Sequence, residues 1–99
     1  MNDFNELING SKPVLVDFYA TWCGPCKMQA PILEDVKRRL GDSVSVVKVD
    51  VDRNSEVAAV YHVQSIPTLM LFKDGKQLWR GTGLHQADDI IATIHKYIG

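Results

Sequence analysis

The feature that most constrains the fold of this chain is a short apolar segment that leads directly into a long amphipathic one. Residues 14–19 are almost entirely Val, Leu, Phe and Tyr, which is typical of a strand buried on both faces. Soon after it, an apolar repeat of helical spacing runs to Leu40, and Gly41 ends it. A strand covered on both faces needs packed layers on either side, so the two segments together favour an α/β fold.

The rest of the chain continues this alternation and then closes with a hairpin and a helix. Asp3 can cap a short first helix, and Lys73-Asp74-Gly75 is a turn between two short β-rich segments. The expected elements, in chain order, are a helix near 3–8, a strand at 14–19, a helix up to 40, a strand at 44–51, a helix at 55–61, strands at 68–72 and 77–80, and a helix from about 87. This order predicts one domain, residues 1–99, built on a mixed sheet with helices on both faces.

The composition excludes several classes of function. The chain has 11 basic and 12 acidic residues without a block of either sign, which gives no support to a nucleic-acid or anionic-membrane partner. Apolar stretches such as 66–72 are too short to span a bilayer. The N-terminus is acidic and amphipathic, unlike a signal peptide. We therefore expect a protein of the reducing cytoplasm.

Cys23 and Cys26 are the only cysteines, and their spacing indicates chemistry rather than structural cross-linking. A bridge between them closes so small a loop that it adds little stability. At the start of a helix, this spacing brings both side chains onto one face within disulfide reach. The helix N-terminus favours a thiolate at Cys23, which would attack a disulfide, while Cys26 would resolve the mixed disulfide. Pro25 suits the first helical turn, where its missing N–H costs nothing.

A zinc site is the alternative interpretation of this pair, and the number of ligands disfavours it. Two further ligands would be needed. The chain has no second cysteine pair, and its three histidines, His62, His85 and His95, form no paired ligand motif. The chain also lacks a flavin- or nicotinamide-binding glycine motif. We therefore expect no metal and no bound cofactor.

The sequence around the cysteines resembles the active-site signature of the thioredoxin family. Residues 16–28 carry the likeness, which continues through Ala30-Pro31, the strand around Lys48 and Asp52, Ile66-Pro67-Thr68, Lys73-Asp74-Gly75 and Gly83. The resemblance implies the thioredoxin fold. Most members begin with an extra strand, whereas this chain starts directly at the expected first helix, so we expect a sheet of four strands. It also implies reduction of disulfides in other proteins, with a thioredoxin reductase or an equivalent electron donor recharging the cysteine pair.

Two other functions remain open. One is a disulfide oxidase or isomerase of an oxidising compartment, although the Gly24-Pro25 pair and the N-terminus speak against it. The other is a binding subunit that uses the same surface with its redox activity incidental.

Asp17 and Lys48 complete the expected catalytic residues. Asp17 interrupts an apolar strand, and a buried carboxylate is costly unless it is paired or protonated. The resemblance makes it the buried acid beneath Cys26 that acts as a general base, and the alternative is a strand-end residue reaching solvent. Lys48, on the neighbouring expected strand, could pair with Asp17, or it could lie on an exposed face.

The resemblance also marks a substrate-binding surface. In thioredoxins the proline matching Pro67 is cis and packs against the disulfide, which leaves the backbone of the preceding residue, here Ile66, free to pair with substrate. Trp22 fits an exposed rim beside the nucleophile, with core packing as its alternative. Gly83 would let the substrate backbone approach closely, or would be a plain turn glycine. We expect Gly24-Pro25 and Pro67 to tune the redox properties of the cysteines.

Two further expectations concern packing. The stripe of the long helix that should face the sheet is formed by Met28, Ile32, Leu33, Val36 and Leu40. Without the family's first strand, residues 44–51 would be an edge strand whose unpaired backbone could support a homodimer, although we expect a monomer.

Overall fold

The computed structural model describes residues 2–99, and these form the expected alternation of helices and strands. In chain order the elements are α1 (Asn2–Ile8), β1 (Val14–Tyr19), α2 (Gly24–Leu40), the 3₁₀ turn η1 (Gly41–Ser43), β2 (Ser45–Asp50), α3 (Ser55–Val60), β3 (Thr68–Lys73), β4 (Lys76–Thr82) and α4 (Ala87–Ile98). Every predicted element is therefore present. The boundaries differ by one or two residues, and β4 extends further at both ends than its apolar core indicated.

The four strands form one mixed sheet in the order β2-β1-β3-β4. β1 runs parallel to β2, and both the β1–β3 and β3–β4 pairs are antiparallel. β1 therefore occupies an inner position, and its carboxyl end leads straight to the cysteine pair. The prediction of a four-stranded mixed sheet is confirmed, and β2 is an edge strand of the sheet that the described residues form.

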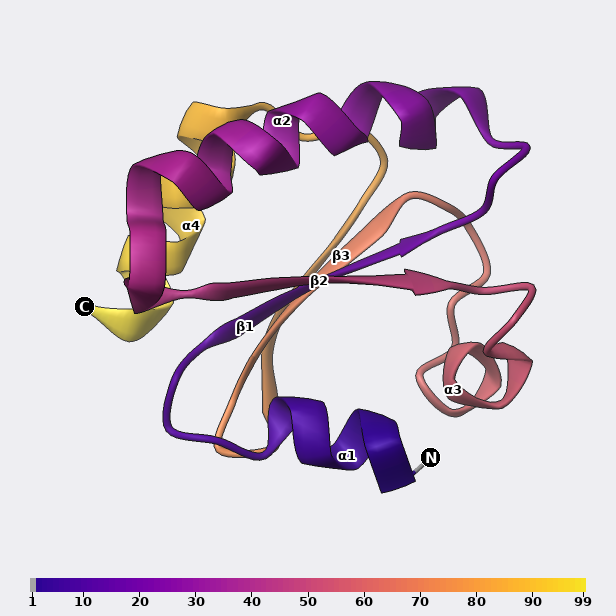
Figure 1. Cartoon of the computed structure of the whole chain (residues 1–99), viewed down its shortest axis with the longest axis horizontal. Helices are drawn as coiled ribbons and strands as arrows, with labels where there is room; N and C mark the ends of the chain where they lie inside the picture. The colour runs from indigo at the N-terminus through magenta and orange to yellow at the C-terminus, as the bar shows by residue number, and fades with distance from the viewer. Residues whose placement is uncertain (1) are drawn as a thin grey trace.

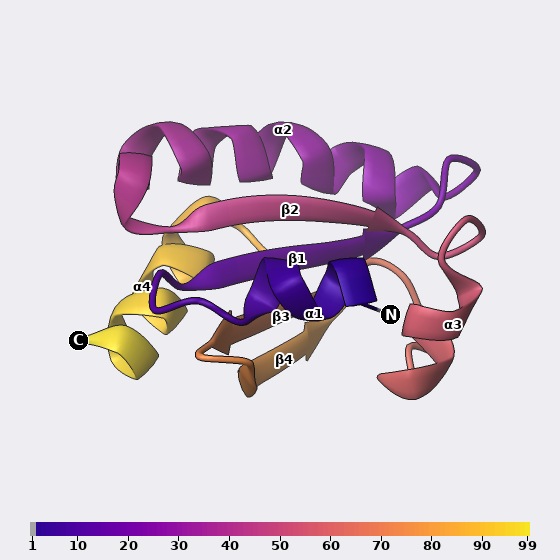
Figure 2. The ribbon, with the colours of Figure 1, turned by 60° about the horizontal axis from the view of Figure 1, so that its bottom comes forward.

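Helices cover both faces of the sheet, as Figure 1 shows with α2 and α4 above it and α1 and α3 below it. On one face, Val16 and Phe18 of β1 pack in a cluster with residues of α1 and α3. On the other face, Leu15 packs with residues of α2 and α4. Alternate side chains of β1 are thus buried in two different cores, which confirms the strand buried on both faces. Figure 2, a turned view, shows α1 in front of β1 and β3 and α2 beyond the edge strand β2.

The predicted inner stripe of α2 was wrong at one position. Met28 is 60% exposed, whereas Gln29 is fully buried. The buried residues of α2 are spaced three, four and three apart, which is one face of an α-helix, and they are Cys26, Gln29, Leu33 and Val36. Since successive residues on a helix are turned by about 100°, burying Gln29 turns Met28 toward solvent.

No helix among residues 2–99 is long and apolar enough to cross a membrane.

Candidate active site

The two cysteines lie at the N-terminus of α2 and are joined by a disulfide. Cys23 is the N-cap residue of the helix, and the backbone N–H of Cys26 donates a hydrogen bond to the Sγ atom of Cys23 at 3.2 Å. Pro25 lies in the first turn, where no backbone donor is lost from the helix. The backbone N–H of Cys26 and the positive end of the helix dipole therefore both face the sulfur of Cys23, an arrangement that stabilises a thiolate in the reduced protein.

Both cysteines are largely covered, with only 4% of each residue exposed. A disulfide substrate must therefore press close to the rim of the site to reach Cys23. Gly24 is exposed and has no atom within 4 Å of the position that a Cβ would occupy. The surface immediately beside Cys23 is thus left open by the absence of a side chain.

The segment before β3 forms the wall opposite the cysteines. The peptide bond between Ile66 and Pro67 is cis, as the resemblance implied, and the carbonyl oxygen of Ile66 lies 3.8 Å from the Sγ atom of Cys23. The backbone N–H of Gly83 donates to the carbonyl oxygen of Pro67 at 2.8 Å. Gly83 has a φ of 83°, a conformation that favours glycine, and open space lies where its Cβ would be. Ile66, Pro67 and Gly83 are thereby brought to one side of the disulfide.

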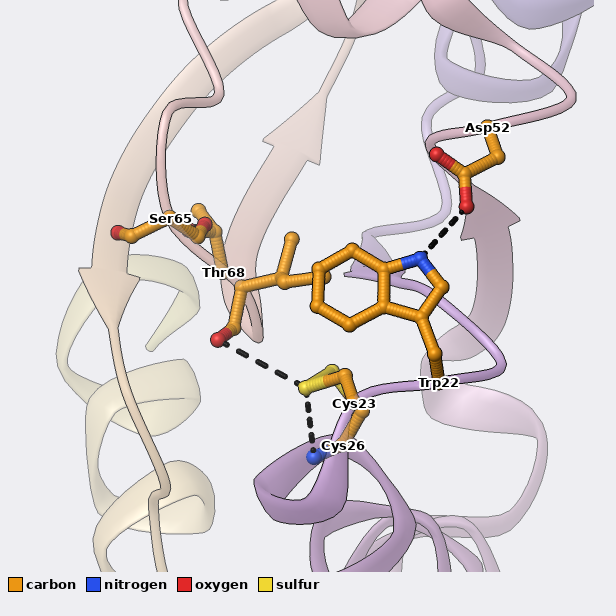
Figure 3. Close-up of a disulfide and its surroundings, with 7 residues drawn as sticks. Trp22, Cys23, Cys26, Asp52, Ser65 and Thr68 are labelled. Carbon is orange, nitrogen blue, oxygen red and sulfur yellow. Dashed lines mark hydrogen bonds between the residues drawn. A yellow bond between two sulfur atoms is a disulfide. The ribbon is translucent and has the colours of Figure 1, made fainter.

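Trp22 is an exposed side chain at the rim of the site, with 69% of its surface accessible. Its indole N–H donates to the Oδ2 atom of Asp52 at 2.9 Å. Figure 3 shows the ring extending beside the cysteine pair toward Asp52. The alternative of core packing is excluded by this exposure. Sequence reasoning did not anticipate the bond to Asp52, because the two residues are 30 positions apart and no local pattern links them.

Asp17 is fully buried on the face of the sheet that α2 covers, so it does not reach solvent at a strand end. Among the described residues, neither of its carboxylate oxygens has a hydrogen-bond partner. Burial raises the pKa of this carboxyl from 3.8 to about 6, and the positive charge of Lys48 lowers it only in part. A buried acid that exchanges its proton close to neutral pH therefore lies on β1, the strand that leads to the cysteine pair.

Lys48 is the register partner of Asp17 on the neighbouring strand, but the two side chains do not form an ion pair. Within residues 2–99, no ion pair joins them at 4 Å or less, and Lys48 is exposed. Its Nζ atom lies over the ring of Tyr19, 4.5 Å from the ring centroid. The expected direct pairing is thus replaced by a cation–π contact and a longer-range attraction.

A pocket of about 320 Å³ borders Cys26 and Lys48. Residues from β1, β2 and the first turns of α2 line it, namely Tyr19, Ala20, Thr21, Cys26, Lys27, Ala30 and Lys48. Cys26 therefore borders the same pocket as the Lys48 side chain. Among residues 2–99, no three His, Cys, Asp or Glu side chains are grouped so that they could hold a metal ion.

Residues 1–96 match the sequence model of the thioredoxin family. The chain belongs to this family. It is 50% identical over 97 residues to a thioredoxin-like protein of Synechocystis sp., an alignment covering 97% of this chain and 92% of that one. It is 46% identical over 94 residues to a chloroplastic thioredoxin Y of Oryza sativa subsp. japonica, which covers 94% of this chain and 56% of the rice protein.

A solved structure agrees with these sequence relationships. A mutant thioredoxin from Halobacterium salinarum superposes with a TM-score of 0.90 at 36% identity, covering all of this chain and 86% of the other. Family membership and the Cys23–Cys26 pair make the chain a thiol–disulfide oxidoreductase that reduces protein disulfides by dithiol exchange. Its substrates are disulfide-containing proteins, and a reductase recharges it. These comparisons give no support to a disulfide oxidase or isomerase, or to a binding subunit with incidental redox activity.

Proposed function

We propose that Cys23 is the attacking cysteine and that Cys26 resolves the intermediate. The Cys23 thiolate attacks one sulfur of a substrate disulfide, which forms a mixed disulfide and releases the other substrate sulfur as a thiolate. Cys26 then loses its proton and attacks the Sγ atom of Cys23, releasing the second substrate thiolate and closing the Cys23–Cys26 bond. Two electrons pass from the protein to the substrate, and the reductase returns them. The observation that carries this assignment is the hydrogen bond from the Cys26 amide to the Sγ atom of Cys23.

Asp17 is the base that accepts the proton of Cys26 in this proposal. Its raised pKa, about 6, makes it a stronger base than an exposed aspartate while leaving it mostly ionised at pH 7. Lys48 takes part by opposing the effect of burial on Asp17, which keeps the carboxylate ionised in the working pH range.

Substrate recognition in this proposal relies mainly on backbone contacts. Ile66 presents its main chain beside Cys23, and the open space at Gly83 lets a substrate backbone approach, so an extended substrate segment can pair with Ile66 as an added strand would. Trp22 adds an apolar surface at the rim. Gly24-Pro25, between the two cysteines, and Pro67, in the facing loop, tune the reduction potential of the disulfide. Because main-chain contacts are common to all sequences, we expect broad substrate specificity.

We further propose that the 99 residues act as one domain and as a monomer in the cytoplasm, where the protein carries electrons for cell redox homeostasis. Both cysteines of the chain belong to the redox pair, which leaves none for a structural disulfide, and this supports a reducing compartment. The rice relative is named as chloroplastic, so a plastid is the competing location. Sedimentation at high protein concentration tests the monomer, and a dimer would point to pairing through the edge of β2.

Two measurements test the proposed chemistry. Mixing the reduced Cys26→Ser variant with insulin should trap a mixed disulfide at Cys23, whereas the Cys23→Ser variant should trap none; the reverse pattern would overturn the assignment of the two cysteines. Equilibration against a thiol–disulfide buffer should give a reduction potential below about −250 mV, close to the family's reference value of about −270 mV. A value above about −200 mV would indicate an oxidase or isomerase instead.

A further inference from the structure

Gln29 is a fully buried polar residue that the catalytic scheme does not use. It lies on α2, three residues after Cys26, at a position on the inner face of the helix. Its Nε2 atom donates to the carbonyl oxygen of His85 at 2.9 Å, and its Oε1 atom accepts from the backbone N–H of His85 at 2.9 Å. One side-chain amide thus satisfies both backbone groups of a residue 56 positions away in the sequence.

His85 lies in the segment between β4 and α4, which has no regular secondary structure of its own. Buried backbone groups outside helices and sheets need other partners, and Gln29 supplies them here. The two hydrogen bonds therefore fix the His85 backbone to the same helix that carries the cysteines. We call this pair of bonds the Gln29–His85 clamp.

The clamp is connected to the wall of the active site by short contacts. The Nδ1 atom of His85 lies 2.8 Å from the carbonyl oxygen of Gly83, and the N–H of Gly83 donates to the carbonyl oxygen of Pro67 at 2.8 Å. Pro67 follows Ile66, whose carbonyl oxygen lies 3.8 Å from the Sγ atom of Cys23. Hydrogen bonds, together with the covalent chain within His85 and between Pro67 and Ile66, thus link Gln29 to the groups that face the disulfide.

Packing around the His85 ring holds this segment from its other side. The ring makes an edge-to-face contact with Trp79, at a centroid distance of 5.5 Å. Both rings lie directly over Gly81, where a Cβ would come within 2.5 Å of the Trp79 ring and 2.8 Å of the His85 ring. The absence of a side chain at Gly81 thus lets the Trp79 and His85 rings pack together. The segment is held between these rings and the Gln29–His85 clamp, which restricts where Gly83 can lie.

We propose that Gln29 is a positioning residue that places Gly83 and the Pro67 loop relative to Cys23, and so favours reduction of protein disulfides over small disulfides. This inference rests on the proposed role of Ile66 and Gly83 in binding the substrate backbone. A protein substrate must align its chain with that wall while its disulfide meets Cys23. A small disulfide needs only access to Cys23, so a displaced wall affects it far less.

The test compares the rates at which reduced variants attack two disulfides in single-turnover mixing. Insulin is the protein disulfide, and 5,5′-dithiobis(2-nitrobenzoic acid) is the small one. Gln29→Met keeps the length of the side chain but removes both hydrogen bonds, and Gln29→Leu serves as a second apolar variant should the first fold poorly. Gln86→Leu is the matched control, because Gln86 is exposed, adjacent to His85 and makes no side-chain bond at its cap position.

Gln29→Met should lower the rate constant with insulin about tenfold, since two hydrogen bonds that fix the wall are lost. The rate constant with the small disulfide should change less than about twofold. The exchange of the His85 backbone amide with solvent should become faster. Gln86→Leu should change none of these quantities.

Equal losses of rate with both disulfides would overturn the inference and place the effect of Gln29 on the cysteines themselves. A Gly83→Ala variant separates this outcome from a failure of the proposed binding wall. If Gly83→Ala discriminates between the two disulfides and the Gln29 variants do not, the positioning role of Gln29 fails alone. If Gly83→Ala does not discriminate either, the binding role of the wall is wrong.

Discussion

Asp17 and Lys48 are register partners on neighbouring parallel strands, yet the ammonium of Lys48 lies over the Tyr19 ring rather than against the carboxylate. The buried acid therefore has a nearby positive charge without a direct bond to it. This arrangement leaves the pKa of Asp17 raised, to about 6, whereas a close ion pair would hold it low. Burial thus raises the pKa of Asp17, and the position of the Lys48 side chain limits by how much that rise is opposed.

Replacing Lys48 by methionine should raise the pKa of Asp17 further, because the only opposing charge is removed while burial remains. Titration of the Asp17 carboxyl carbon by NMR, in the oxidised protein, measures the shift directly. Lys12→Met, a change at an exposed lysine, is the control and should leave the titration where it is. An unchanged Asp17 titration in Lys48→Met would show that the two charges are not coupled.

The stability of the protein should depend on pH through Asp17. Its pKa is about 6 in the folded protein and near 3.8 when unfolded, so the folded state binds the proton more tightly. The contribution of Asp17 to the free energy of unfolding is therefore most favourable below pH 3.8. It falls as the pH rises to about 6, and above that pH the free energy of unfolding stays lower by about 3 kcal/mol.

Asp17→Asn stays uncharged at every pH and removes this loss. The variant should be more stable than the wild type by up to about 3 kcal/mol at pH 8, with the difference disappearing below pH 4. Urea unfolding of the oxidised proteins at both pH values measures it. A difference that is the same at pH 8 and pH 3.5 would instead assign the effect to packing.

The same variant should be slower at one catalytic step only. Asp17→Asn removes the base for Cys26, so resolution of the mixed disulfide at pH 7 should slow by at least about tenfold. The initial attack by Cys23 should be nearly unchanged, since its thiolate is stabilised by the Cys26 amide and the helix terminus. Stopped-flow mixing resolves the two phases. Unchanged resolution across neutral pH would remove Asp17 from the mechanism.

The bond between Trp22 and Asp52 should matter for substrate contact more than for folding. Asp52→Ala frees the indole N–H, which should then exchange faster with solvent in NMR spectra. Because the bond is exposed, the free energy of unfolding should change by less than about 1 kcal/mol. The rate of insulin reduction should fall severalfold, since the ring is no longer held at the rim. Asp42→Ala, at another exposed aspartate, serves as the control.

Local patterns predicted much of this structure because they act over a few residues. The apolar run at β1, the glycine after α2 and the turn before β4 each determine the backbone nearby, and all three elements formed where expected. The position of Cys23 at the helix terminus followed in the same way. The burial of Asp17 was also predictable, since it interrupts a strand whose neighbours on both faces are apolar.

Contacts between distant segments were not predictable from such patterns. Gln29 reads as a surface residue in the sequence, and only its bonds to His85 make its burial favourable. Met28 was consequently assigned to the wrong face of α2. The Lys48 side chain lies over the Tyr19 ring of β1 instead of contacting Asp17. No local sequence pattern predicts which of these two residues it contacts.

The cysteine pair lies at the first turn of a helix and closes a loop of only a few residues, with Cα atoms 5.2 Å apart. Opening or closing this bond changes the freedom of almost none of the chain. The oxidised and reduced proteins can therefore share one scaffold, with the sheet and both helical layers unaltered. Each redox cycle then proceeds without a refolding event. The rate of disulfide reduction is therefore limited by encounters with substrate and reductase and by proton transfer at the site.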